Sequence, residues 1–546
     1  MQSERPVDAL FVGWEKQENL GLRYVMAYLN AHGLRTELAP FSPLRPESIL
    51  ELVERLNPSL VGFSIIFQYN LREFSLAMDR LRADGVTAHF TAGGHFPSLS
   101  PERTLADLPA LDSVVRFEGE ATALELVRKL DRRHEWPSIE GLAYREGAGV
   151  IVNPPRPLIG DLDSLPWPVR GDTPQTCRGI PTAPMLASRG CLHDCSFCSI
   201  RQFYGAAPGP LRRTRSPRDV VAEMRSLYLR QGVRVFLFQD DDFAARTEQQ
   251  RRWVEAFLSE LDTAGLTGRI AWKISCRVDD VEPGLMAECR RRGLLAVYLG
   301  VESGNAEGLK SLGKRVSVEQ NLRALEALRQ ARVDYDMGFM LFDPDSTFES
   351  VRENLRFLRV VAEIEGPPIS FVKMLPLAGT SIQKRLAAEG RLTGDDVRPD
   401  YNFLDRRLDY FYLFVILNFS RRNSDPAGLV ERLRQAYFDS VLVNAFGLDP
   451  RGPSYQAALR GVIDRANRSA LDVLEQALGL FERCPDARTA ALRWHENGPL
   501  AATERRDEQQ ILAELDAVLE EYNPALALAF REAGVHGPED TELEAA

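Results

Sequence analysis

The sequence predicts an α/β protein with three parts: a doubly wound parallel sheet, an open, partial parallel (β/α)6 barrel, and a mainly α-helical C-terminal region. Short β-branched and aromatic runs alternate with amphipathic stretches of helix length, which is typical of βαβ units. A glycine-turn hairpin and a proline-rich connector interrupt this alternation once, and the strand-like runs stop after about residue 390. Because 546 residues are too many for one ordinary core, we expect several domains. Their expected bounds are 1–137 for the sheet, 138–180 for the linker, 181–390 for the barrel and 391–546 for the helices.

The first region contains five strand-like runs, separated by helical patterns such as "PESILELVERL" and "REFSLAMDRLRADG". In a doubly wound sheet, ligands bind beyond the carboxyl ends of the strands. Those ends carry Gly93, Gly94 and His95 after one strand, and Glu118 and Gly119 after another. The five expected strands are "ALFVGW", "RTELAPF", "LVGFSII", "VTAHFTAGG" and "SVVRFEG".

The second region repeats the strand–helix alternation six times, which predicts an incomplete barrel. Active-site residues of parallel barrels lie on the loops that follow the strands. The segment "RGCLHDCSFCSI" comes directly after the first expected strand, on the catalytic rim. The expected strands are "TAPMLAS", "VRVFLFQ", "RIAWKISCRV", "LAVYLGVES", "VDYDMGFMLF" and "ISFVKMLP", with helices at 218–231, 248–265, 282–293, 317–332 and 347–364.

The third region has helical patterns only. In "QQILAELDAVLEEY" the apolar residues fall on one helical face, and Asn523-Pro524 ends the pattern. The aromatic run "DYFYLFVILNF" predicts a buried helix face rather than a substrate cage. We expect these helices to cap the barrel mouth and contact the substrate, and residues 537–546 to form a frayed acidic tail.

The composition excludes several classes of protein. A net charge of −11 argues against a nucleic-acid-binding surface. The sequence has no run of eighteen apolar residues, so we expect no membrane span. The N-terminus has no apolar stretch of signal-peptide length. Seven mostly scattered cysteines do not make a disulfide framework, so we expect a reducing, cytoplasmic location.

Three of the seven cysteines, Cys191, Cys195 and Cys198, lie within eight residues in a CxxxCxxC pattern. Thiolates suit zinc or iron–sulfur clusters. A structural zinc site needs four ligands and a second cysteine pair, which this chain lacks. A 4Fe–4S cluster held by three cysteines leaves one iron open to a substrate or cofactor. The metal-free alternative is three free thiols, which the clustering disfavours.

With an aromatic Phe197 before the last cysteine, the segment resembles the CxxxCxΦxC signature of the radical SAM superfamily. The resemblance implies a partial (β/α) barrel and a 4Fe–4S cluster whose open iron chelates S-adenosylmethionine. It also implies that one electron from the cluster cleaves the sulfonium to methionine and a 5′-deoxyadenosyl radical. The electron comes from an external donor such as flavodoxin or ferredoxin.

Later strand ends resemble the superfamily's other S-adenosylmethionine contacts. "FQDDDF" places Asp240 and Asp241 for the methionyl ammonium, with Asp242 where the superfamily often has asparagine. The alternative for this acidic stretch is a solvated strand end without a ligand. The remaining implied contacts are Ser275 and Arg277 in "KISCRVD" for the carboxylate, Glu302 in "LGVESG" for the ribose, and Met340 in "GFMLFDPDST" near the adenine. Cys276 and Cys289 are expected to be core residues.

A doubly wound sheet before such a barrel resembles the cobalamin-binding radical SAM subfamily, over residues 8–390. The marks are "LGLRYVMAYLNAHG", "VGFSIIFQY", "TAGGHFPSLSPERTL" and "DSVVRFEGEAT". The segment "FVGWEKQENLG" lacks the histidine of D-x-H-x-x-G, which implies cobalamin bound base-off without a protein imidazole on cobalt. The implied cobalamin contacts are Ser64, Phe67, Gln68, Tyr69, Gly93, Gly94, His95, Glu118 and Gly119.

Phe67, Gln68 and Tyr69 would face the lower side of the corrin, and the two glycines would let the backbone approach the nucleotide tail. His95 receives no cobalt role, because a lone histidine after a Gly-Gly turn is more often a hydrogen-bonding loop residue. The alternative for the whole sheet is a docking domain without a cofactor, since folds of this type host many functions.

The resemblance implies methyl transfer from S-adenosylmethionine, through methylcobalamin, to an unactivated carbon of a specialised metabolite or peptide. Two enzyme alternatives share the same residues: a radical ring closure, ring contraction or other rearrangement, and non-radical methylation of an aromatic carbon. A non-enzymatic iron–sulfur or sensor protein is a fourth possibility, which the ordered strand-end motifs disfavour. Detection of S-adenosylhomocysteine, 5′-deoxyadenosine, both or neither separates the four.

Overall fold

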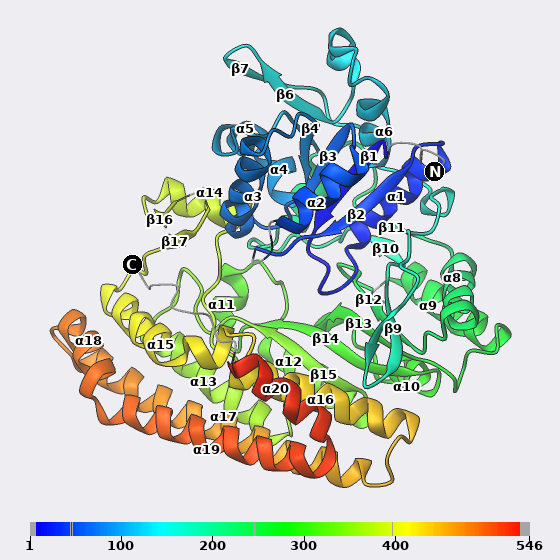
Figure 1. The fold of residues 1–546 in the computed structure, drawn as a ribbon. Helices are drawn as coiled ribbons and strands as arrows, with labels where there is room; N and C mark the ends of the chain where they lie inside the picture. The colour runs from blue at the N-terminus through cyan, green and yellow to red at the C-terminus, as the bar shows by residue number, and fades with distance from the viewer. Residues whose placement is uncertain (1–6, 44, 46, 244–246, 396, 536–546) are drawn as a thin grey trace. The chain divides into compact units, whose positions relative to one another are not determined.

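A computed structural model describes residues 7–43, 45, 47–243, 247–395 and 397–535, and it divides into two compact units. Unit 1 comprises residues 1–275 and 375–401, and unit 2 comprises residues 276–374 and 402–546. Figure 1 shows the strands and helices of both units along the chain. The expected acidic tail at 537–546 lies outside the described residues.

Unit 1 begins with a seven-stranded sheet in the order β2-β1-β3-β4-β5-β6-β7, whose first five strands are parallel (Figure 1). The expected hairpin supplies β6 and β7, which extend this sheet as antiparallel strands. The strands are β1 (Ala9–Gly13), β2 (Thr36–Pro40), β3 (Leu60–Ser64), β4 (His89–Gly93), β5 (Ser113–Val115), β6 (Leu142–Glu146) and β7 (Gly149–Val152). The helices are α1 (Leu20–Ala31), α2 (Glu47–Leu56), α3 (Leu71–Ala83), α4 (His95–Leu99), α5 (Pro101–Asp107) and α6 (Glu120–Arg128).

Helices cover both faces of this sheet because successive strand side chains alternate between the faces. Leu10 and Val12 of β1 belong to the apolar cluster that contains residues of α2 and α3. Ala9 and Phe11 belong to the opposite cluster, with residues of α1 and α6. The doubly wound arrangement predicted from the sequence is therefore confirmed.

Unit 1 continues with the first barrel strands. β9 (Ile180–Met185), β12 (Val235–Phe238) and β13 (Ala271–Arg277) pair in parallel, and β8 (Gln175–Cys177) joins β9 antiparallel. A short ribbon of β10 (Ser188–Arg189) and β11 (Arg213–Thr214) brackets the cysteine segment. The helices here are α7 (Ser199–Gly205), α8 (Pro217–Gln231) and α9 (Glu248–Thr263), and later in the chain α14 (Ser381–Ala388).

Unit 2 contains the parallel pair β14 (Leu294–Glu302) and β15 (Asp334–Phe339) and then the C-terminal helices. The helices beside the strands are α10 (Pro283–Arg291), α11 (Ala306–Ser311), α12 (Val318–Gln330) and α13 (Phe348–Glu363). The C-terminal helices are α15 (Arg406–Ser424), α16 (Leu429–Phe446), α17 (Gly452–Arg483), α18 (Ala487–Asn497), α19 (Pro499–Tyr522) and α20 (Pro524–Val535). Among the described residues, every helix is too short or too polar to cross a bilayer.

The α/β class and the helical C-terminal region are confirmed, but two details of the prediction were wrong. The sixth barrel run, 369–376, forms a single parallel bridge between Phe342 and Lys373 instead of a strand. The backbone of Ile369, the first residue of this run, bonds to side chains of helices. Its amide donates to Asn467, and its carbonyl accepts from Arg422. Strands also continue past 390, as the antiparallel pair β16 (Leu392–Gly394) and β17 (Pro399–Tyr401).

Helical packing in the C-terminal region follows the predicted faces. Ile511, Leu515 and Leu519 of α19 are buried in an apolar cluster, and Leu512, Val518 and Tyr522 pack against it. The aromatic run of α15 is a core face, with Phe411, Phe414 and Phe419 fully buried.

Candidate functional site

The three clustered cysteines lie in one loop between β10 and α7. All three are half-buried thiols outside any disulfide, and the Cys198 amide donates to the Cys195 carbonyl at 3.2 Å, which closes a tight turn. Gly190 precedes the loop with φ +84°, and an added Cβ would lie 1.9 Å from the Leu211 carbonyl oxygen. Only glycine fits there, so the backbone of the loop is set before its first cysteine.

The donors in this loop suit an iron–sulfur cluster with one open iron. Burial and, next, the charge of Asp242 together raise the pKa of Cys191 to about 12, so this thiol is protonated at neutral pH unless a metal cation offsets both effects. Three thiolates in one turn are the ligand set of such a cluster, and they would hold it by Cys191, Cys195 and Cys198. Cys276 and Cys289 are buried away from solvent, as predicted.

Asp240 and Asp241 support the cysteine loop. The Asp240 carboxylate accepts from the Ser188 hydroxyl at 2.5 Å and the Ala187 amide at 3.1 Å, and Asp241 accepts from the Gly190 amide at 2.9 Å. Burial raises the pKa of both carboxyls to about 6. The sequence assigned both carboxylates to the methionyl ammonium, whereas the structure shows them bonded to the residues before Cys191.

A cavity of about 460 Å³ lies at the carboxyl ends of the N-terminal strands, within unit 1. Gly94 has φ +115°, and a Cβ there would lie 2.3 Å from the Ile65 carbonyl oxygen, so the β4 turn requires glycine. The cavity is within the size range of small-molecule and cofactor sites. Six of the residues implied for cobalamin line it: Ser64, Gly93, Gly94, His95, Glu118 and Gly119.

Two of these lining residues have protein partners of their own. His95 Nδ1 lies 3.3 Å from the Ser199 hydroxyl, and burial lowers its pKa to about 4, so the imidazole is neutral at pH 7. Burial would raise the pKa of Glu118, but Arg189 and Arg213 together lower it. Arg189 Nη1 is 3.0 Å and Arg213 Nη1 is 2.8 Å from the Glu118 carboxylate. Glu118 is therefore an ionised anchor for the segments on either side of the cysteine loop.

The residues after β3 divide into exposed and buried side chains. Phe67 and Tyr69 are 38% and 41% exposed, and their rings stack with centroids 5.2 Å apart. Gln68 between them is only 3% exposed, and its Oε1 accepts from the Ala378 amide at 2.8 Å. The aromatic pair is available to a flat ligand such as a corrin, whereas the Gln68 side chain has a partner in the returning segment before α14.

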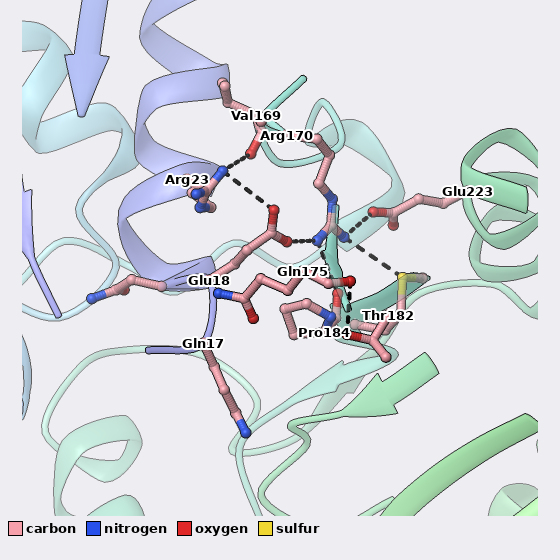
Figure 2. A network of polar contacts seen from close by, with 12 residues as sticks. Gln17, Glu18, Arg23, Val169, Arg170, Gln175, Thr182, Pro184 and Glu223 are labelled. Carbon is pink, nitrogen blue, oxygen red and sulfur yellow. Dashed lines mark hydrogen bonds and ion pairs between the residues drawn. The ribbon is translucent and has the colours of Figure 1, made fainter. Parts of the chain in front are cut away.

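A second wall of the cavity is the loop after β1, which includes Gln17, Glu18 and Asn19. Figure 2 shows the ion pairs that hold it: Glu18 accepts from Arg170, whose other nitrogen lies 2.7 Å from Glu223. Arg23 lies 3.5 Å from Glu18 and donates to the Val169 carbonyl at 2.9 Å (Figure 2). The proline-rich linker thus fixes the loop after β1 through Arg170 and Val169.

In unit 2, Glu302 and Met340 lie together. The Met340 amide donates to the Glu302 carbonyl at 2.9 Å, and the Glu302 carboxylate is 3.1 Å from Lys314 Nζ. Gly300 and Gly338 face each other in register on β14 and β15, and an added Cβ at either would meet the Glu302 carboxylate. The two glycines thus make room for the Glu302 carboxylate, and the ribose and adenine assignment made from the sequence stays a prediction.

The other two implied contacts are engaged locally. Buried Arg277 donates to the Lys314 carbonyl at 2.7 Å and pairs with Asp279 at 2.8 Å. Ser275 is half-buried on β13, and its carbonyl accepts from the Phe243 amide at 3.0 Å. Sequence reasoning missed Lys314 and Arg170 because no motif marks either residue; the carboxylate partners of Arg170 also lie 152 and 53 residues away.

Two family models match the chain in order. The B12 binding domain matches residues 15–127, and the Radical SAM superfamily matches residues 185–358, together more than half of the chain. The first range contains the six cavity residues implied for cobalamin, and the second contains the cysteine loop.

Curated relatives include methyltransferases and cyclases. An uncharacterised methyltransferase of Pyrococcus horikoshii is 27% identical over 377 residues, which cover 68% of this chain and 79% of that protein. The anaerobic magnesium-protoporphyrin IX monomethyl ester cyclase of Rubrivivax gelatinosus is 28% identical over 355 residues, 62% of this chain and 61% of that protein.

Among solved structures, the cobalamin-dependent S-adenosylmethionine radical enzyme OxsB, with aqua-cobalamin and S-adenosylmethionine bound, superimposes with a TM-score of 0.70. It is 16% identical, and the match covers 97% of this chain and 83% of that one, so the likeness is one of fold. With both family models in the same order, the chain belongs to the cobalamin-dependent radical SAM enzymes, whose cofactors are a 4Fe–4S cluster, S-adenosylmethionine and cobalamin.

Proposed function

We propose that the protein transfers a methyl group from S-adenosylmethionine, through cobalamin, to an unactivated carbon of a small specialised metabolite or peptide. The observation that carries the proposal is the shared wall between the cysteine loop and the cavity. Asp241 and Arg189 line the cavity, while Asp241 also accepts from Gly190, directly before Cys191. The methyltransferase relatives support the same reaction class.

When bound, the three cofactors supply a methyl donor, a methyl carrier and a one-electron reductant. The chain's own residues hold and orient these groups. Cys191, Cys195 and Cys198 bind the cluster, Glu302 with Lys314 orients the ribose end of S-adenosylmethionine, and the walls around Gly93 hold cobalamin. Orientation of this kind supplies much of the rate enhancement, because reacting groups that are already aligned lose little entropy at the barrier.

The experiment is anaerobic purification with cobalamin supplied, followed by metal analysis and turnover with candidate substrates and a reduced flavodoxin or ferredoxin. We expect about four irons and one cobalt per chain, and both S-adenosylhomocysteine and 5′-deoxyadenosine with a methylated product. The matched control replaces all three loop cysteines by alanine. It should keep cobalt, lose iron and form neither nucleoside product.

A second candidate is ring closure or another rearrangement without methyl transfer, which the cyclase relative favours. It predicts 5′-deoxyadenosine without S-adenosylhomocysteine. Non-radical methylation of an aromatic carbon predicts the reverse. A protein that binds iron but no cobalt would remove the methyl carrier and leave the N-terminal sheet as a docking domain.

A further inference from the structure

One face of the β14–β15 pair carries polar residues and glycines, and we call it the polar face. Side chains alternate along each strand, so Val297, Leu299 and Val301 are buried on the opposite face, where Phe339 stacks on Phe357 of α13. The register places Tyr298 opposite Asp336 and Gly300 opposite Gly338. The polar face consists of Tyr298, Gly300, Glu302, Asp334, Asp336 and Gly338.

Helix α16 of the C-terminal region lies against this face. Arg434 and Tyr437, three residues apart and therefore on one side of the helix, reach Asp336 and Asp334. The Tyr437 hydroxyl donates to Asp334 at 2.6 Å and accepts from Arg460 at 2.9 Å. The Tyr437 hydroxyl therefore has a partner both as a donor and as an acceptor.

The contact between Arg434 and Asp336, one helical turn earlier on α16, has fewer hydrogen bonds. Arg434 Nε lies 3.3 Å from Asp336 but makes no hydrogen bond, and Nη2 reaches only the Ser370 hydroxyl at 3.5 Å. Tyr298 is 41% exposed, and no described residue accepts a hydrogen bond from its hydroxyl. Burial, with the charge of Glu302, raises the Tyr298 pKa to about 12, so the phenol is a donor at neutral pH.

We propose that Arg434 and Tyr298 bind an oxyanion of the substrate, a carboxylate or a phosphate ester, on the polar face. The Tyr298 hydroxyl and the Arg434 guanidinium are the donors here, and an Arg guanidinium paired on one edge still presents its other nitrogens. Asp336 orients the guanidinium. Gly300 and Gly338 leave space for the side chains of Glu302 and Tyr298 beside this subsite. This inference rests on the proposed function, because it assigns that reaction's substrate to an anionic class.

The test is ligand-observed NMR on the cofactor-loaded full chain, with benzoate, phenyl phosphate and benzamide as probes. The three share one ring and differ in head group, so they separate carboxylate, phosphate and uncharged recognition. Arg434→Met removes the cation at similar length, Arg434→Lys keeps the charge, and Tyr298→Phe removes only the hydroxyl. Arg465→Met, on α17, is the matched control, because Arg465 forms an exposed ion pair with Glu514 of α19.

We expect benzoate or phenyl phosphate to bind the wild type and the Arg465→Met control equally, and benzamide to bind at least tenfold more weakly. Arg434→Met should weaken the anionic probe about tenfold, Arg434→Lys less, and Tyr298→Phe several-fold. Equal binding of benzamide, unchanged binding to Arg434→Met, or no binding of either anion to the wild type would overturn the proposal. Because the readout is binding, an enzyme that binds the anion through Arg434 but transfers no methyl group refutes only the proposed function.

Discussion

Glu223 of α8 is the shared counter-ion of two buried arginines, and replacing it with glutamine tests how the linker is held to the barrel. One carboxylate oxygen lies 2.7 Å from Arg170 and the other 2.6 Å from Arg215, and the Glu223 side chain is 2% exposed. Glutamine keeps one acceptor and turns an amide donor toward the second guanidinium. Breaking a buried pair on one side costs about 3–5 kcal/mol.

Each arginine retains a second carboxylate, Glu18 for Arg170 and Asp219 for Arg215, so we expect the lower end, about 3 kcal/mol of unfolding free energy. The assay is urea unfolding followed by tryptophan fluorescence and circular dichroism. The control is Glu255→Gln, which removes an exposed pair with Arg251 on α9 and should cost about 0–1 kcal/mol. A loss below about 1 kcal/mol for Glu223→Gln would refute the view that this buried carboxylate holds the two arginines.

Three further predictions concern the cysteine loop, the C-terminal bundle and the returning segment. Gly190→Ala should lower the iron content to near that of the triple-cysteine variant, because the added Cβ would meet the Leu211 carbonyl. Cobalt binding should persist. Metal analysis measures both, and a full iron content would contradict this prediction. Burial raises the Glu504 pKa to about 7, so the folded protein holds a proton that the unfolded chain releases, and unfolding free energy should fall by about 3 kcal/mol from pH 4.5 to pH 7. Glu504→Gln should flatten that dependence in urea titrations, and an unchanged slope would count against it. Gln68→Leu should weaken cobalamin binding several-fold in absorbance titrations by freeing the segment at Ala378, whereas equal affinity would limit Gln68 to packing.

Local sequence patterns predicted most of the fold and the centre of the cluster site. Strand–helix alternation is a short-range signal, and the five N-terminal strands and the strand-end glycines at 93–94 lie where it predicted. The three cysteines occupy one loop, so their proximity follows from spacing alone. The prediction of a sixth barrel strand failed because the partners of its backbone, Asn467 and Arg422, come from helices 98 and 53 residues away, which a local pattern does not contain.

The sequence by itself determined which residues can carry the chemistry: a cysteine loop, glycine turns and a carboxylate after β14. Only the tertiary structure decided how their neighbours act. Gln68, expected beneath a corrin, accepts a hydrogen bond from Ala378, 310 residues further along, and two arginines from beyond the linker balance the charge of the ionised Glu118. Lys314 beside Glu302 and Arg434 beside Asp336 had no motif at all. Hydrogen bonds and ion pairs of this kind depend on distances between residues remote in the chain, and those distances exist only once the chain has folded.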